Sequence, residues 1–212
     1  VLSGATFDVS GAPSTFSTSN LQKIQGSGTI VGPYNHDEGF IRPGDVASAT
    51  AANEGNLSSG VVPTGGTINF SGPLSFNGGT IIYDMSTNPA AGNDLIQVTG
   101  VTNLSGGGVV DPNFLAGEPA VGLTYTVLSS SGGFGGSSPT GWTVDWPGRG
   151  AKPALFTNGN LLQFTTTPIA GNANLIWSGA QSGSWDVETS QNWTNGGSPD
   201  VYFQGDNVTF SQ

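Results

Sequence analysis

The stretch from Gly65 to Gly108 constrains the fold most tightly, because it places five short apolar runs between strong breakers. Each run is about one strand long, with apolar residues at near-alternate positions, as a half-buried strand requires. The runs are Ile68 with Phe70, Leu74 with Phe76, Ile81 with Tyr83, Ile96 with Val98, and Val101 with Leu104. A two-sheet sandwich also has short, regularly spaced strands, but glycine at nearly every corner favours a wound β-solenoid.

Composition supports an all-β fold for the whole chain. The sequence holds 35 glycines, and only 8% of its 212 residues are charged, so turns are numerous and long amphipathic helices are scarce. Hydrophobic residues make up 35%, which is enough to bury a core. We therefore predict a right-handed parallel β-helix with some antiparallel additions, ending in a tryptophan-rich β module.

Charge and residue content exclude several classes of function. Four basic residues against 14 acidic ones give a net charge of −10, which repels nucleic acid and anionic membrane surfaces. The chain has no cysteine, so disulfides and thiolate metal sites are excluded. No apolar run approaches the roughly eighteen residues of a membrane span, and we expect no membrane insertion. There is no GxSxG, HExxH or phosphate-loop motif.

Changes in pattern along the chain predict two domains. Residues 1–172 form the predicted β-helical domain, with an irregular excursion near 33–64 where periodicity is lost. The sequence around Asn158 and Gly159 predicts a hairpin whose two strands pair antiparallel. Residues 173–212 concentrate three of the five tryptophans, and we place the module boundary near Asn172.

The C-terminal segment contains a characteristic succession of Trp, Gly, Asn and Asp residues. Its elements are Trp177-Ser-Gly, Gly183-Ser-Trp185-Asp186, Asn192-Trp193 and Gly205-Asp206-Asn207-Val208-Thr209-Phe210. This pattern resembles the autotransporter-associated β-strand repeat of large bacterial surface proteins, and the preceding segments resemble the β-helical passenger regions between such repeats. The resemblance covers about two thirds of the chain. It implies an extracellular or cell-surface location more than any activity, and tryptophans that seal a small β module.

Two polar clusters are candidates for metal binding or acid–base chemistry. His36, Asp37 and Glu38 stand together, but adjacent residues rarely converge on one ion, and we favour a solvated loop. An oxygen-rich set could hold Ca²⁺, yet it lacks the spacing of a calcium loop, so we favour turn formation and predict no cofactor. This set is Asp186, Glu188, Asn192, Asn195, Asp200, Asp206 and Asn207.

Polysaccharide is the alternative ligand. A sugar-stacking platform could be built from Trp142, Trp146, Trp185, Trp193 and Tyr202, although core packing explains these rings better. A glycosidase would need two carboxylates across a cleft, and neither Asp84 with Asp94 nor Asp145 with Asp186 is singled out by spacing. A lyase would need cations, and the basic residues are few and scattered. We therefore predict a non-enzyme with no catalytic or metal site, and keep a glycan-binding adhesin module as the alternative.

The strongest functional expectation is structural. The chain opens on LSGATFDVSG and closes on NVTFSQ, both strand-like, as if cut from a continuing stack. We expect copies of the chain to join end to end into a β-rich fibre, or to form tandem repeats of one long polypeptide. The expected interface residues are Val1, Leu2, Phe7, Val9, Trp177, Trp185, Trp193, Val208 and Phe210.

Overall fold

The computed structural model describes residues 1–44, 65–169, 171–203 and 205–210. These residues form 20 strands and contain no helix, which confirms the predicted all-β class. The chain divides into two compact units. Unit 1 comprises Val1–Asp145 and Pro153–Thr166, and unit 2 comprises Trp146–Lys152 and Thr167–Gln212.

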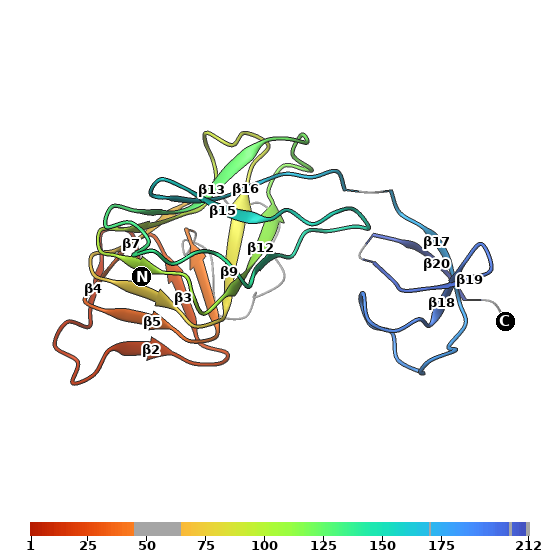
Figure 1. Ribbon diagram of the computed structural model, residues 1–212, viewed down its shortest axis with the longest axis horizontal. Helices are drawn as coiled ribbons and strands as arrows, with labels where there is room; N and C mark the ends of the chain where they lie inside the picture. Colours follow the sequence, from red (N-terminus) through yellow and green to blue (C-terminus); the bar gives the residue numbers. More distant parts are fainter. Residues whose placement is uncertain (45–64, 170, 204, 211–212) are drawn as a thin grey trace. The chain divides into compact units, whose positions relative to one another are not determined.

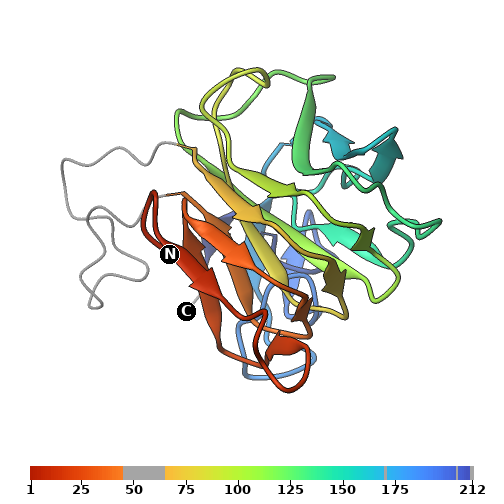
Figure 2. The same cartoon turned by 90° about the vertical axis from the view of Figure 1, so that its left-hand side faces the viewer.

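Unit 1 contains three sheets, which we name A, B and C (Figures 1 and 2). Sheet A has the order β1 (Thr6–Asp8), β4 (Thr29–Val31), β7 (Thr67–Phe70), β10 (Leu95–Val98), β13 (Thr124–Ser130), β16 (Leu161–Thr165), β15 (Leu155–Asn158). Sheet B has the order β11 (Thr102–Asn103), β8 (Leu74–Phe76), β5 (Tyr34–His36), β2 (Phe16–Thr18). Sheet C has the order β14 (Trp142–Val144), β12 (Gly108–Phe114), β9 (Thr80–Met85), β6 (Phe40–Pro43), β3 (Lys23–Gly26).

The chain visits these sheets in strict rotation from β1 to β12. We call three consecutive strands, one each in A, B and C, a round. The first round is β1 to β3, the second β4 to β6, the third β7 to β9 and the fourth β10 to β12. Every strand in the first three rounds pairs in parallel with its counterpart in the next round. The apolar runs between Gly65 and Gly108 lie on or beside strands of the third and fourth rounds.

Matching side chains of successive rounds build the core of unit 1. In sheet A, Ile96 pairs with Ile68 on one side and with Leu128 on the other, and all three are fully buried. In sheet C, Ile81 lies between Ile41 and Val110 in the same way. Burying a side chain of this size contributes about 1.5–3 kcal/mol. The alternation of apolar residues in the sequence thus becomes an inward-facing ladder.

A column of glycines lets the rounds approach each other closely where sheet A gives way to sheet B. A Cβ added to Gly100 would lie 2.6 Å from the carbonyl carbon of Gly72, and one added to Gly132 would lie 2.6 Å from that of Gly100. Gly72 approaches the carbonyl oxygen of Gly32 similarly, at 2.3 Å. Glycine is required here because the neighbouring backbone occupies the space of a side chain.

Two sequence predictions can be compared directly with these strands. The predicted hairpin is confirmed, since β15 and β16 pair antiparallel around Asn158 and Gly159. The predicted irregular excursion near 33–64 is wrong for its first part, which forms β5 and β6 with buried Tyr34 and Ile41. These strands are three and four residues long, too short for periodicity to reveal. Residues 45–64 lie outside the described part of the chain.

Unit 2 contains sheet D, in the order β19 (Ser198–Asp200), β18 (Trp193–Asn195), β17 (Asn174–Trp177), β20 (Asn207–Thr209). β17 pairs antiparallel with β18 and parallel with β20. β18 and β19 form a hairpin whose two loop residues, Gly196 and Gly197, have φ angles of 56° and 88°. Two successive positive φ values suit a type I′ turn, which matches the twist of a hairpin and favours glycine.

Candidate functional site

The first round supplies a terminal strand to each sheet of unit 1, and Val1 hydrogen-bonds to Gln25 O along the outer edge of β3. β1, β2 and β3 are the terminal strands of sheets A, B and C, so the described residues place no strand beyond them. Val9 N–H donates to Val31 O at 2.8 Å, and Thr29 N–H donates to Ala5 O at 2.9 Å. Because backbone groups alternate sides along a strand, those of Thr6 face away from β4.

The apolar core continues to the free edge of β1. Phe7 is 38% exposed and packs edge-to-face on Phe16, with ring centroids 5.3 Å apart. Phe16 in turn stacks on Tyr34, which packs against Phe70. The inner members of this series, Tyr34 and Phe70, are fully buried. The aromatic stack is therefore sealed within the unit and exposed at β1.

The remaining expected interface residues of unit 1 differ in exposure. Leu2 is exposed, Val1 is half-buried, and Val9 is buried within unit 1. The backbone O of Val1 accepts from Gly28 N–H at 3.1 Å, so Val1 lies beside the end of β3. Leu2 and Phe7 are thus the residues of this group that offer large apolar side chains to solvent.

The expected interface residues of unit 2 meet in one aromatic cluster. Trp193 is buried at its centre, and the rings of Trp177, Trp185 and Phe210 all lie within 6 Å of it, at 4.9, 5.2 and 5.7 Å. Trp185 is 49% exposed and is held edge-to-face by Trp193 and Tyr202. Val208 lies half-buried in β20. The cluster thus has a sealed centre and an open aromatic side.

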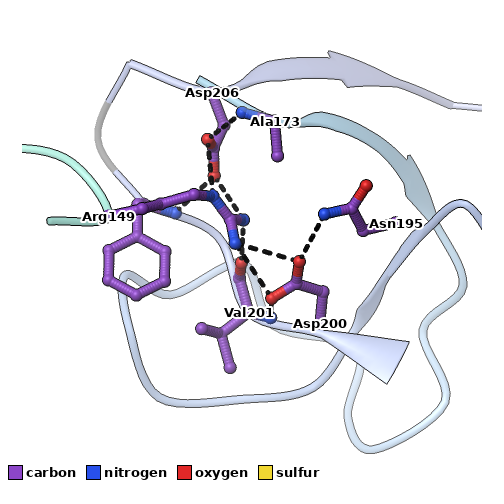
Figure 3. Close-up of polar contacts among 7 residues, drawn as sticks. Arg149, Ala173, Asn195, Asp200, Val201 and Asp206 are labelled. Carbon is purple, nitrogen blue, oxygen red and sulfur yellow. Dashed lines mark hydrogen bonds and ion pairs between the residues drawn. The ribbon is translucent and has the colours of Figure 1, made fainter. Parts of the chain in front are cut away.

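An ion-pair network in unit 2 is centred on Arg149 (Figure 3). The guanidinium donates from Nη1 to both carboxylate oxygens of Asp200, at 2.9 and 3.1 Å, and from Nε and Nη2 to Asp206, at 3.0 and 2.8 Å. Nη2 also donates to Val201 O at 2.8 Å. The guanidinium carbon lies 4.7 Å from the ring centroid of Phe203. This is a bidentate, charge-assisted arrangement of the strong kind.

The same network holds the turn before β20. Asp206 accepts from the backbone N–H groups of Ala173 and Phe203, both at 2.8 Å. Burial alone would raise the pKa of Asp206, but the hydrogen bonds from Arg149 and these backbone donors outweigh it, and the pKa is lowered. Asp206 is therefore held as an anion, and its charge is compensated within unit 2.

The other members of the oxygen-rich set also contact protein groups. Asn192 accepts from the backbone N–H groups of Gln181 and Ser182, and Asp186 accepts from the backbone N–H of Ser190. Glu188 pairs with Lys152 at 2.7 Å. Across the described ranges, no three His, Asp or Glu side chains converge as a metal site would require. The turn-forming interpretation accounts for these residues, and their side chains shape unit 2.

Two buried acids of unit 1 lie together where sequence spacing had not singled them out. Asp94 accepts from the backbone N–H of Asp84 at 3.0 Å and from that of Gly66 at 2.8 Å. Asp84 Oδ1 accepts hydrogen bonds from Arg42 Nη2 at 3.2 Å and from Asn113 Nδ2 at 2.7 Å. Burial and the charge of Asp84 raise the pKa of Asp94 to about 8.

Asp94 lines a cleft of about 480 Å³, together with the rest of residues 89–95 and with Thr67, Tyr83, Thr126, Ser129 and Leu161. Asp84 and Asp94 are 0% and 1% exposed. A glycosidase pair must reach the scissile bond from both sides, and these carboxyls instead bond backbone and Arg42. Asp145 lies in unit 1 and Asp186 in unit 2.

The solvated-loop prediction for the single histidine is wrong. His36 lies in β5, is fully buried, and its Nδ1 lies 3.0 Å from Thr18 Oγ1. Burial lowers the pKa of His36 to about 4, which keeps the ring neutral at physiological pH. Asp37 accepts instead from Asn77, and Glu38 is exposed. β5 ends at His36, and Asp37 and Glu38 follow it outside the strand, so the three side chains do not converge on one site.

The aromatic residues considered for sugar stacking are mostly buried. Trp142 packs on Phe76 and donates from Nε1 to Leu104 O at 2.9 Å, and Trp146 and Trp193 are also buried. Tyr202 is half-buried beside Trp185. Of the five candidate residues, Trp185 is the most exposed, at 49%.

No protein-family model matches this chain, and the comparison with curated proteins finds no match. The resemblance to the autotransporter-associated repeat therefore stays a prediction. In the described ranges, no helix is long and apolar enough to cross a membrane.

Proposed function

We propose that this protein is a structural, self-associating component of an extracellular or cell-surface β-rich fibre. Unit 1 would be a right-handed parallel β-helix, and unit 2 the tryptophan-rich module of a surface-protein repeat. The rotation of strands through sheets A, B and C supports the first part, because parallel neighbours one round apart are the pairing that a solenoid uses. The pattern around Trp177, Trp185 and Trp193 supports the second.

The terminal position of the first round is the observation that carries this proposal. The edges of β1 and β2 and the exposed Phe7 belong to the first round of unit 1, and an unpaired strand edge is a template for pairing with another chain. The partner would be unit 2 of another copy, whose edge strands β19 and β20 can add to such an edge. A head-to-tail contact of this kind uses two different surfaces, so it extends into a filament.

Charge sets the conditions for this association. Copies of net charge −10 repel one another at low ionic strength. At 0.1 M salt, the repulsion between charges more than about 10 Å apart is largely screened. We therefore expect the oligomer to grow when salt is raised from about 0.01 to 0.15 M, the range over which the screening length shortens most.

A proline on the open edge tests the proposal. Thr6→Pro removes an N–H that faces away from β4, so the bonds between β1 and β4 remain while the edge loses a donor. We expect the large species of the wild type to shift to monomer in sedimentation velocity at about 0.15 M salt. The matched control is Thr6→Ala, which keeps the N–H and should associate as the wild type does.

Two outcomes would contradict the proposal. One is a wild-type chain that stays monomeric at every salt concentration, and the other is unchanged association of Thr6→Pro. A denaturing gel separates the two forms of the fibre. Separate subunits give a band near 21.4 kDa, and a tandem array gives a far larger one.

Glycan binding is a second candidate, favoured by the half-exposed ring of Trp185. Its edge-to-face contacts with Trp193 and Tyr202 hold the ring rigidly, which suits stacking against the apolar face of a sugar. Titration of a neutral cell-wall polysaccharide should then change tryptophan emission. Trp185→Ala should abolish the change, while Trp142→Phe, in the core of unit 1, should preserve it. A polysaccharide-degrading activity is the weaker candidate, since Asp84 and Asp94 are both buried.

A further inference from the structure

A short segment of unit 2 comes from a stretch of sequence that otherwise forms unit 1. Trp146–Lys152 belongs to unit 2, although the residues on both sides of it, Asp145 and Pro153, belong to unit 1. We call Trp146–Lys152 the strap, and residues 167–212 the body of unit 2. The body is covalently continuous with unit 1 only after Thr166. The strap and the body therefore reach each other by noncovalent contacts.

Strap and body carry opposite charges. The strap has Arg149 and Lys152, which are two of the four basic residues of the chain, and no acidic residue. The body has four acidic residues and no Lys, Arg or His. Those four are Asp186, Glu188, Asp200 and Asp206. On a chain of net charge −10, the strap is the one cationic segment matched to the acidic body of unit 2.

The contacts between them are local and specific. Arg149 of the strap donates to Asp200, Asp206 and Val201 O (Figure 3). Lys152 pairs with Glu188 at 2.7 Å. The side chains of Arg149 and Lys152 remain 18% and 40% exposed. Trp146 of the strap and the side chain of Asp206 are each 1% exposed, so a strap that leaves its own body must regain the same contacts in another copy.

We propose that the strap of one copy binds the body of another copy, by exchange of these same contacts. The inference deepens the proposed self-association and rests on it. Exchange reproduces contacts that every chain already makes, so no new interface has to be built. Within one chain the local concentration favours the strap's own body, but copies joined head to tail by edge association bring a second strap to comparable concentration.

Crosslinking between single-cysteine chains tests this exchange, because the native sequence has no cysteine. Lys152→Cys and Glu188→Cys place thiols on the strap and on the body. The two variants are mixed under associating salt, treated with a short bismaleimide, and run on a denaturing gel. We expect a covalent dimer in the mixture that is at least fivefold more abundant than in either variant alone.

Three controls establish what a crosslinked dimer means. Glu118→Cys removes an exposed acid of unit 1, and its mixture with Lys152→Cys should give no more dimer than the single variants. Adding Arg149→Ala to the Lys152→Cys chain should reduce the dimer at least fivefold, because that strap no longer has the group that reaches Asp200 and Asp206. The double variant Lys152→Cys with Glu188→Cys shows by its monomeric crosslink that the contact forms within one chain.

The results separate the two proposals. If the protein sediments as an oligomer and the mixture gives no dimer, while the double variant crosslinks within one chain, strap exchange is overturned and edge association stands. A protein that sediments as a monomer at all salt concentrations overturns the proposed self-association itself. A dimer that persists undiminished with Arg149→Ala also overturns the exchange, because it does not depend on the strap's recognition.

Discussion

Units 1 and 2 are both built from β-strands, but different forces hold them. In unit 1, aliphatic and aromatic side chains repeat from round to round, and the glycine column lets successive rounds meet closely. In unit 2, the aromatic cluster around Trp193 and the ion pairs of Arg149 hold short strands of three or four residues. Unit 1 is thus a stack of similar layers, whereas unit 2 is assembled around two particular side chains.

This difference predicts how each unit responds to change. Hydrophobic burial hardly depends on salt, while partly exposed ion pairs are screened by it. A stack distributes its stability over many equivalent contacts. A small module concentrates stability in few residues, so single substitutions remove a larger share of it.

The largest expected effect is that of Trp193→Ala. This ring is 1% exposed and contacts four other rings, so its removal should destabilise unit 2 by about 4 kcal/mol and unfold it. Four of the five tryptophans lie in unit 2, so its unfolding can be followed by emission. Trp185→Ala, at the open side of the cluster, should cost less than half as much. Equal losses would show that Trp193 is not the centre of the cluster.

Gly100→Ala should have the next largest effect, this time on unit 1. The added Cβ meets the backbone of Gly72, which can move only if two rounds separate, and we expect a loss of about 3 kcal/mol in chemical denaturation. Gly11→Ala is the matched control, because no atom lies within 4 Å of its added Cβ. If both variants were equally stable, the rounds would not be closely stacked at this corner.

Arg149→Ala should destabilise unit 2 by about 2 kcal/mol, between the values of exposed and buried ion pairs. The pKa values of Asp200 and Asp206 are lowered in the folded state. Their contribution to the stability of unit 2 is therefore fully present above their unfolded-state pKa near 3.8, and it is lost as pH falls through their folded-state pKa values. The difference between wild type and variant should therefore shrink below pH 4 and in high salt. If the stability difference depended on neither pH nor salt, Arg149 would stabilise unit 2 by packing and not by its charge.

The smallest effect concerns the pH dependence of unit 1. His36 binds its proton less well in the folded state than in the unfolded state. Its contribution to stability is therefore present above pH 6.5 and is lost as pH falls toward about 4. Asp94 binds its proton better in the folded state, so its contribution is present below 3.8 and is lost as pH rises toward about 8. The effects of the two groups on stability oppose each other between about pH 4 and pH 6.5. Between pH 6.5 and about pH 8, only Asp94 makes stability depend on pH.

We therefore expect a flat stability profile followed by a fall of up to about 2 kcal/mol on the alkaline side. Chemical denaturation of unit 1 across this pH range measures it. Asp94→Asn should remove the alkaline fall, whatever its effect on absolute stability. A fall of the same size in Asp94→Asn would place the responsible group elsewhere.

Local patterns were sufficient to predict much of unit 1. Alternating pairs such as Ile68 with Phe70 indicated strands, and the hairpin at Asn158 and Gly159 was predicted with its antiparallel pairing. They were insufficient at β5 and β6, where three or four residues around Tyr34 and Ile41 carry too little periodicity. Pairing with β2 and β8 on one sheet, and with β3 and β9 on another, stabilises these strands from outside the segment.

By itself, the sequence determined that this protein is all-β, acidic and rich in tight turns, because these properties depend on composition and on the conformational preferences of neighbouring residues. The tertiary structure decided which distant residues meet. It brought Arg149 to Asp200 and Asp206, set Asp94 against Asp84, and turned His36 into the core of unit 1. The physical reason is that these contacts join residues 10 to 57 positions apart, and their geometry exists only after the strands have paired.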